Sequence, residues 1–278
     1  MELSWLQSLI MGLFSGLTDV LPVSSQAHQT LLLKFFGGTR LDPVTSLVIR
    51  CAVLVTLLVI CWGQIGRIRR QLRVMRQPRR RKNRTIDMAA LMDAKMLKTA
   101  LFPILVMLLL RGLTAPLGGS LPWIVAASLL NAVILYLPGL FPTADKDSRL
   151  ATPMESIQMG LGAGASVLPG ISSVGACYSV GILHGMDRGY MIHLTLLMHM
   201  MVTTGLAVGD VLQIIASGAA AADGGAVLRY VLAAASAAVG TSLGCRILHA
   251  AASRKGLTGF SFYSFGVALF TFILYLMV

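Results

Sequence analysis

One sequence pattern occurs in both halves of the chain, as "MGLFSGLTDVLPVSS" from Met11 to Ser25 and as "MGLGAGASVLPGISS" from Met159 to Ser173. Each begins with Met-Gly-Leu, carries a second glycine four residues after the first, contains Val-Leu-Pro and ends in two serines. A proline interrupts each stretch, and the apolar parts on either side are too short to cross a bilayer alone. We therefore expect two re-entrant hairpins, each a half-helix that enters the membrane and one that returns.

The composition is that of a polytopic membrane protein. Hydrophobic residues make up 56% of the 278 residues, charged residues only 12%, and the mean hydropathy is +0.78, which excludes an ordinary soluble domain. Apolar segments of about 20 residues predict six spans. They are Val44–Trp62, Thr99–Thr114, Leu121–Phe141, Tyr190–Ser217, Gly225–Leu248 and Gly259–Val278. The predicted fold class is an all-α membrane protein with six transmembrane helices and two re-entrant helix hairpins.

One basic segment dominates the net charge of +12. Ten of the 23 Lys and Arg residues lie between Arg67 and Arg84, with no acidic residue among them. Short basic loops stay in the cytoplasm, so we expect a cytoplasmic loop over residues 66–97 and no nucleic-acid partner. Contacts with anionic membrane lipids fit the same charge. With this loop inside, the other basic loops also fall inside and both termini fall outside.

Three predicted spans separate the two hairpins. An odd number of crossings reverses orientation, so residues 1–141 and 151–278 are predicted to form inverted repeats whose broken tips meet near the bilayer midplane. Helices that restart there direct backbone N–H groups and positive dipole ends to one place, which suits a phosphate. The candidate phosphate-binding residues at the tips are Ser24, Ser172, Ser173, Gly170 and Gly175. The alternative is that the glycines only make close helix contacts and the serines only cap helices.

The first stretch carries more reactive groups than the second. Asp19 precedes the proline, and Ser25 and His28 follow it and lie within one helical turn of each other. Ser25 and His28 share a helix face, so the imidazole could take the hydroxyl proton or itself attack phosphorus. Ionisable residues at membrane depth are functional candidates, and we predict all three as catalytic, with Asp19 also a candidate metal ligand. Alternatively, His28 only satisfies a backbone carbonyl.

"SGLTDVLPVSSQAH", Ser15 to His28, resembles the first signature of the bacitracin-resistance family of undecaprenyl-diphosphate phosphatases, and "LPGISSVGACYSVGILHGMDR", Leu168 to Arg188, resembles the second. The likeness covers nearly the whole chain. It implies an inverted-repeat fold, often dimeric, in the bacterial inner membrane. It also implies removal of the terminal phosphate of a C55 polyprenyl diphosphate, usually with a divalent cation such as Mg²⁺ or Ca²⁺, which recycles the lipid carrier of cell-wall synthesis.

The resemblance carries over residue by residue, with departures. Asp19 matches the second glutamate of the family's acidic pair, while Ser25 and His28 match its serine and histidine. The chain has other residues where the family has a first glutamate, two arginines and a further acid, namely Ser15, Ser173, Ser264 and His193, in that order. Losing the arginines removes planar donors that hold a diphosphate bidentately, and losing the glutamate removes half of a cation or acid/base site.

Arg50 adds a positive charge instead of removing one, because the family commonly has glutamine at this position. We predict that Arg50 binds phosphate and takes over part of the lost arginines' duty, with Asp19 or a lipid phosphate as its partner. Alternatively, its side chain snorkels to the headgroups.

Two classes of function follow from the sequence. As an enzyme, the protein hydrolyses a polyprenyl diphosphate. As a transporter, it carries a polyprenyl phosphate between leaflets without chemistry, and a lipid-binding protein with neither activity is a further alternative. The surviving Asp19, Ser25 and His28 favour the phosphatase.

Overall fold

The computed structural model describes residues 3–76, 86–142, 144–217, 224–254 and 257–277. Within these ranges the chain is helical and contains no strand, which confirms the all-α prediction. The α-helices are α1 Trp5–Val20, α2 Ser25–Phe35, α3 Pro43–Ile60, α4 Trp62–Arg76, α5 Met88–Leu109, α6 Arg111–Thr114, α7 Leu121–Tyr136, α8 Pro153–Gly164, α9 Ser173–Leu183, α10 Arg188–Ser217, α11 Gly224–Arg254 and α12 Gly259–Met277. Three 3₁₀ turns, η2 Ala115–Gly119, η3 Leu137–Leu140 and η4 Ala165–Val167, extend α6, α7 and α8.

The described helices make a multi-pass membrane protein. Five are long and apolar enough to cross a bilayer: α3, α7 with η3, α10, α11 and α12. The candidate for a sixth span is the pair formed by α5 and the segment Arg111–Gly119, bent by 44° at the break between them. Gly112 and Pro116, both poor helix formers, follow the break. Five of the six predicted spans therefore correspond to long apolar helices, and the second corresponds to this bent pair, which counts as a span only if its two helices cross the bilayer together.

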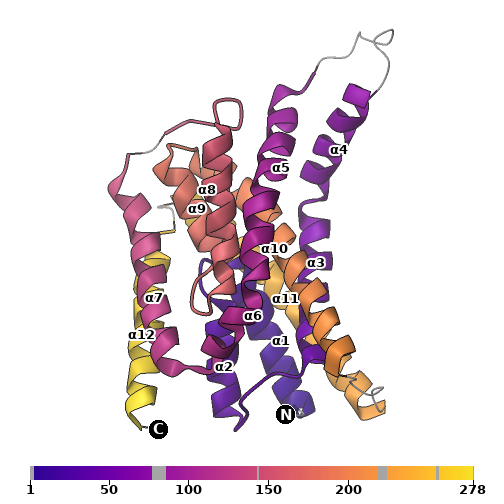
Figure 1. Cartoon of the computed structure of the whole chain (residues 1–278), viewed down its shortest axis with the longest axis vertical. Helices are drawn as coiled ribbons and strands as arrows, with labels where there is room; N and C mark the ends of the chain where they lie inside the picture. The colour runs from indigo at the N-terminus through magenta and orange to yellow at the C-terminus, as the bar shows by residue number, and fades with distance from the viewer. Residues whose placement is uncertain (1–2, 77–85, 143, 218–223, 255–256, 278) are drawn as a thin grey trace.

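Much of the predicted basic loop over residues 66–97 is helical, and its cytoplasmic location stays a prediction. α4 continues to Arg76 and α5 begins at Met88, and in Figure 1 both helices extend beyond the rest of the bundle. Ion pairs link the two helices, because Arg67 lies 3.1 Å from Asp93 and 3.6 Å from Asp87. The drop in hydropathy after residue 66 indicates where the apolar part of the span ends, but the helices continue beyond that point. Residues 77–85, with the remaining basic cluster, lie outside the described residues.

Both repeated stretches break at their prolines, as predicted. α1 and α2 lie on either side of Pro22, and α8 and α9 on either side of Pro169. Ser24 and Ser172 cap the restarting helices, since each hydroxyl accepts a hydrogen bond from a backbone N–H three residues later. In Figure 1 the α1–α2 hairpin enters the bundle from the end that holds both termini, and the α8–α9 hairpin enters from the opposite end.

The two halves of the chain pack reciprocally. α1 packs on α11 and α8 packs on α5, while α3 contacts α10 and α7 contacts α12. A Cβ at Gly12 or Gly16 would come within 2.2 and 2.1 Å of carbonyl oxygens of α11, and a Cβ at Gly160 within 2.7 Å of one in α5. The glycines therefore permit close helix contacts, as the alternative proposed. We interpret the reciprocal helix contacts as those of the expected inverted repeat. The boundaries of the two repeats, at residues 141 and 151, stay a prediction.

Hydrogen bonds join the two hairpin tips inside the bundle. The Gly170 N–H donates to Ser24 Oγ at 3.0 Å, and Ser172 Oγ donates to the Leu21 carbonyl at 3.2 Å. Asn131 of α7 links both tips, because its Nδ2 donates to the Pro22 carbonyl and its Oδ1 accepts from the Ser172 N–H. The largest buried apolar cluster, built around α9 and α10, surrounds this junction. The fold thus holds two polar helix breaks rigidly against each other.

Candidate active site

A small cavity lies where the hairpin tips meet. Residues of both hairpins line it, among them Ser25 and Ser173, together with Arg50 of α3 and His199 of α10. Its volume of about 20 Å³ holds roughly one water molecule. This space is too small for a phosphate group, so side chains must move before one can enter.

The carboxylate of Asp19 forms the centre of this cavity. Ser25 Oγ donates to Asp19 Oδ1 at 3.0 Å, and His199 Nε2 donates to Asp19 Oδ2 at 3.0 Å. Thr203 Oγ1 lies 3.2 Å from the same ring nitrogen. A carboxylate that already accepts the serine hydroxyl hydrogen can take that proton when the oxygen attacks an electrophile. The arrangement thus provides a nucleophile, a base and a residue that orients the base.

His199 is a site residue that the sequence analysis missed. It lies within the apolar segment of α10, and its side chain is only 5% exposed. The rule that marks an ionisable residue at membrane depth as a functional candidate applies to His199 as it does to His28. The signal was present in the sequence, but nothing local connected it to Asp19.

The ring of His28 lies away from Ser25. Its Nδ1 donates to the Ser24 carbonyl at 2.7 Å, so in the neutral ring Nε2 accepts from the Tyr263 hydroxyl at 2.8 Å. The two rings stack with centroids 5.7 Å apart. The structure brings Ser25 to Asp19 and does not bring His28 to either residue. The hydrogen bond to the Ser24 carbonyl agrees with the alternative in which His28 only satisfies a backbone carbonyl. A catalytic role for His28 stays a prediction.

Arg50 pairs with a residue that we did not anticipate. Its Nε lies 2.7 Å from Asp210 Oδ2, and the two side chains are 13% and 2% exposed. The proposed partner Asp19 is therefore replaced by Asp210, and burial excludes a side chain that snorkels to the surface. Arg50 still lines the cavity beside Asp19, so its positive charge reaches the site.

Most of the predicted phosphate ligands have partners within the protein. The Gly170 and Gly175 N–H groups donate to Ser24 Oγ and Ser172 Oγ, and these hydroxyls also hold the hairpin tips together. Gly170 additionally has a φ of +111°, which favours glycine. Ser173 Oγ is buried and lacks a partner among the described residues. Of the five predicted ligands at the tips, Ser173 is thus the one with an unused hydroxyl. Phosphate binding by these residues stays a prediction.

Comparison with known proteins identifies the family. The model of the family "Bacitracin resistance protein BacA" matches residues 8–270. The chain belongs to the BacA family. It is 28% identical over 204 residues to an undecaprenyl-diphosphatase of Carboxydothermus hydrogenoformans, covering 73% of this chain and 72% of that protein. It is 27% identical over 278 residues to the undecaprenyl-diphosphatase of Rubrobacter xylanophilus, covering 96% of each chain.

Two of the four departures of this BacA family member are filled by neutral hydrogen bonds. Ser15 Oγ accepts from Gln29 Nε2 at 3.1 Å, and Ser264 Oγ accepts from Asn131 Nδ2 at 3.0 Å. His193 lines a different cavity, beside Arg67, Asp93 and Tyr190. Ser15 and Ser264 therefore replace charged residues of the family, and each of these serine hydroxyls has a hydrogen-bond partner.

The described part of this BacA family member offers a divalent cation few ligands. It contains no group of three or more His, Cys, Asp or Glu side chains placed to hold a metal. In the tip cavity Asp19 is the single carboxylate, and both of its oxygens accept hydrogen bonds. These residues do not fit a resident, protein-held metal centre. A cation that needs only one carboxylate and takes its other ligands from phosphate and water is the remaining possibility.

Proposed function

We propose that this BacA family member is an undecaprenyl-diphosphatase that uses the Ser25–Asp19 pair to release inorganic phosphate. The names of its relatives support the reaction. The hydrogen bond from Ser25 Oγ to Asp19, made in a cavity bounded by both hairpin tips, is the observation that carries the assignment of the site. The product is the polyprenyl monophosphate carrier of cell-wall synthesis.

The reaction proceeds in two displacements. Ser25 Oγ bonds to the terminal phosphorus while its proton passes to Asp19, and the bond from phosphorus to the bridging oxygen breaks, releasing polyprenyl monophosphate. Water then attacks the phosphoserine, Asp19 returns the proton to Ser25 Oγ, and inorganic phosphate leaves together with one proton from the water. The net change is hydrolysis of one phosphoanhydride bond.

Two neighbours support this chemistry. His199 holds the Asp19 carboxylate in position by donating to the oxygen that Ser25 does not use. Arg50, on the wall of the same cavity, places positive charge where negative charge develops on the phosphate. A Mg²⁺ or Ca²⁺ ion would have Asp19 as its single protein carboxylate, with phosphate and water as its other ligands, and would neutralise phosphate charge.

The orientation of the bundle follows from its basic end. α4 carries Arg67, Arg69, Arg70, Arg73 and Arg76 at the end opposite both termini (Figure 1). Because basic segments next to spans stay in the cytoplasm, we propose a bacterial inner-membrane protein with both termini outside. The homodimer implied by the resemblance is also a proposal, and light scattering of the purified chain tests it.

Phosphate release from undecaprenyl diphosphate by the purified chain tests the proposed function. We expect release with Mg²⁺ or Ca²⁺, a lower rate with chelator, and a loss of about 10²-fold or more in Ser25→Ala. Ser179→Ala is the matched control, because it removes a buried hydroxyl of α9 that does not line the cavity. A wild-type chain that binds the lipid but releases no phosphate would overturn the proposal in favour of the transporter or lipid-binding alternative.

A further inference from the structure

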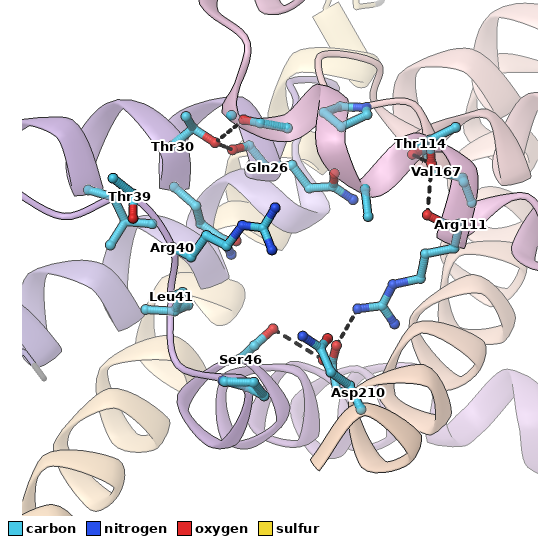
Figure 2. A pocket seen from close by; sticks show the side chains of 18 of the residues that line it. Gln26, Thr30, Thr39, Arg40, Leu41, Ser46, Arg111, Thr114, Val167 and Asp210 are labelled. Atoms are coloured by element: carbon cyan, nitrogen blue, oxygen red, sulfur yellow. Dashed lines mark hydrogen bonds and ion pairs between the residues drawn. The ribbon is translucent and has the colours of Figure 1, made fainter. Parts of the chain in front are cut away.

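A second, larger cavity adjoins the site. Its volume is about 220 Å³, and its lining includes residues of α2 and of the loop before α3, which lie at the end of the bundle that holds both termini (Figure 1). α2, the loop before α3, the segment Arg111–Gly119 and the last turns of α10 enclose it (Figure 2). Gln26 and Arg50 line both this cavity and the small one around Asp19, so the two cavities adjoin at those side chains.

The charge of this cavity is positive. Three arginines and one aspartate are its charged lining residues, a net formal charge of +2. The aspartate, Asp210, is buried and forms ion pairs with Arg50 and Arg111. It also accepts a hydrogen bond from the Ser46 hydroxyl at 3.1 Å. One carboxylate therefore fixes two guanidinium groups in place without neutralising the cavity.

Donors remain for an anion. Arg50 contacts Asp210 through Nε, and its two terminal nitrogens have no hydrogen bond within the described chain. Arg40 forms no ion pair with any described residue, and Figure 2 shows Arg40 and Arg111 reaching into the cavity from different walls. Guanidinium groups held in fixed positions favour tetrahedral oxyanions, which they bind through charge-assisted hydrogen bonds.

The volume suits a small anion with its water. Roughly 30 Å³ is the share of one water molecule, so 220 Å³ accommodates a phosphate group with several waters. The lining combines arginine, glutamine and threonine side chains with apolar ones such as Leu33, Leu41 and Val167.

We propose that this cavity is a phosphate-binding vestibule, occupied by a phosphate dianion that passes between the Ser25 site and the end of the bundle with both termini. That dianion is either inorganic phosphate or the headgroup of a prenyl monophosphate, which present the same oxygens to the arginines. The assignment of this route rests on the proposed function, whereas phosphate binding by the cavity does not.

Equilibrium dialysis of the full chain in detergent tests the proposal with two probes, radioactive inorganic phosphate and farnesyl phosphate. Arg40→Gln removes an exposed, unpaired charge from the cavity wall, and we expect about fivefold weaker binding of at least one probe. Lys34→Gln is the matched control, since it removes one exposed charge from α2 outside the cavity and should leave both affinities unchanged. Asp210→Asn removes the neutralising carboxylate and should tighten binding about threefold or more.

The two probes distinguish the source of the phosphate. If Arg40→Gln weakens binding of inorganic phosphate alone, the cavity is an exit route for the product. If it weakens binding of farnesyl phosphate alone, the cavity is a binding site for the lipid headgroup. Equal binding of both probes by the wild type, Arg40→Gln and Asp210→Asn overturns the vestibule. A chain that binds phosphate through Arg40 but releases none from the lipid overturns the phosphatase and keeps the vestibule, and the reverse pattern overturns the vestibule alone.

Discussion

Replacement of His199 by leucine separates the role of this histidine from simple packing. The side chain is buried and its Nε2 donates to Asp19 at 3.0 Å, so leucine removes one hydrogen bond to a charged group at similar volume. Such a bond is worth roughly 1.5–3 kcal/mol. Because about 1.4 kcal/mol corresponds to a factor of ten, kcat should fall roughly 10- to 150-fold. KM should change little, since Asp19 acts on the serine proton and not on lipid binding.

The assay is the initial rate of phosphate release at a series of undecaprenyl diphosphate concentrations. His199→Gln keeps a donor and should recover part of the lost kcat. His193→Leu is the matched control, because it makes the same change on α10 at a residue that lines a different cavity. If His199→Leu kept kcat within twofold of the wild type, or raised KM alone, His199 would not orient the catalytic carboxylate.

Three further variants have defined outcomes. Ser173→Arg should lower phosphate release, because Arg50 already lines the same small cavity, and adding Arg50→Gln to it should recover activity in the same assay. His28→Ala should lower kcat by about tenfold and not abolish it, since the ring contacts the Ser24 carbonyl and not Ser25; a loss as large as that of Ser25→Ala would restore the ring to the chemistry. Gly16→Ala should destabilise the bundle by about 1–3 kcal/mol, because its Cβ would lie 2.1 Å from a carbonyl oxygen of α11, whereas Gly63→Ala, with open space around it, should leave the melting temperature in detergent unchanged.

The hairpins could be predicted because their signals are local. Pro22 and Pro169 cannot continue a helix, and Ser24 and Ser172 are strong caps, so a few consecutive residues determine each break. The same locality explains why the helices over residues 66–97 were not predicted. Charge and hydropathy locate the edge of the apolar layer, but a helix with arginines on its surface continues beyond that edge.

The contacts that complete the site could not be predicted in this way. His199 lies 180 positions from Asp19 along the chain, and Arg50 lies 160 positions from Asp210. Each pair joins the two halves of the molecule, so its geometry depends on how the halves pack. The direction of the His28 ring likewise depends on Tyr263, which reaches α2 from the last helix. Sequence spacing placed Ser25 and His28 on one helix but did not determine their partners.

Asp19→Asn tests the central claim most directly. The change preserves shape and removes the base that accepts the Ser25 hydrogen. Phosphate release from undecaprenyl diphosphate and binding of the lipid should be measured side by side for the wild type and the variant. We predict that release falls by about 10²-fold or more while lipid binding is retained. Equal release by Asp19→Asn and the wild type would contradict the assignment of the reaction to the Ser25–Asp19 pair.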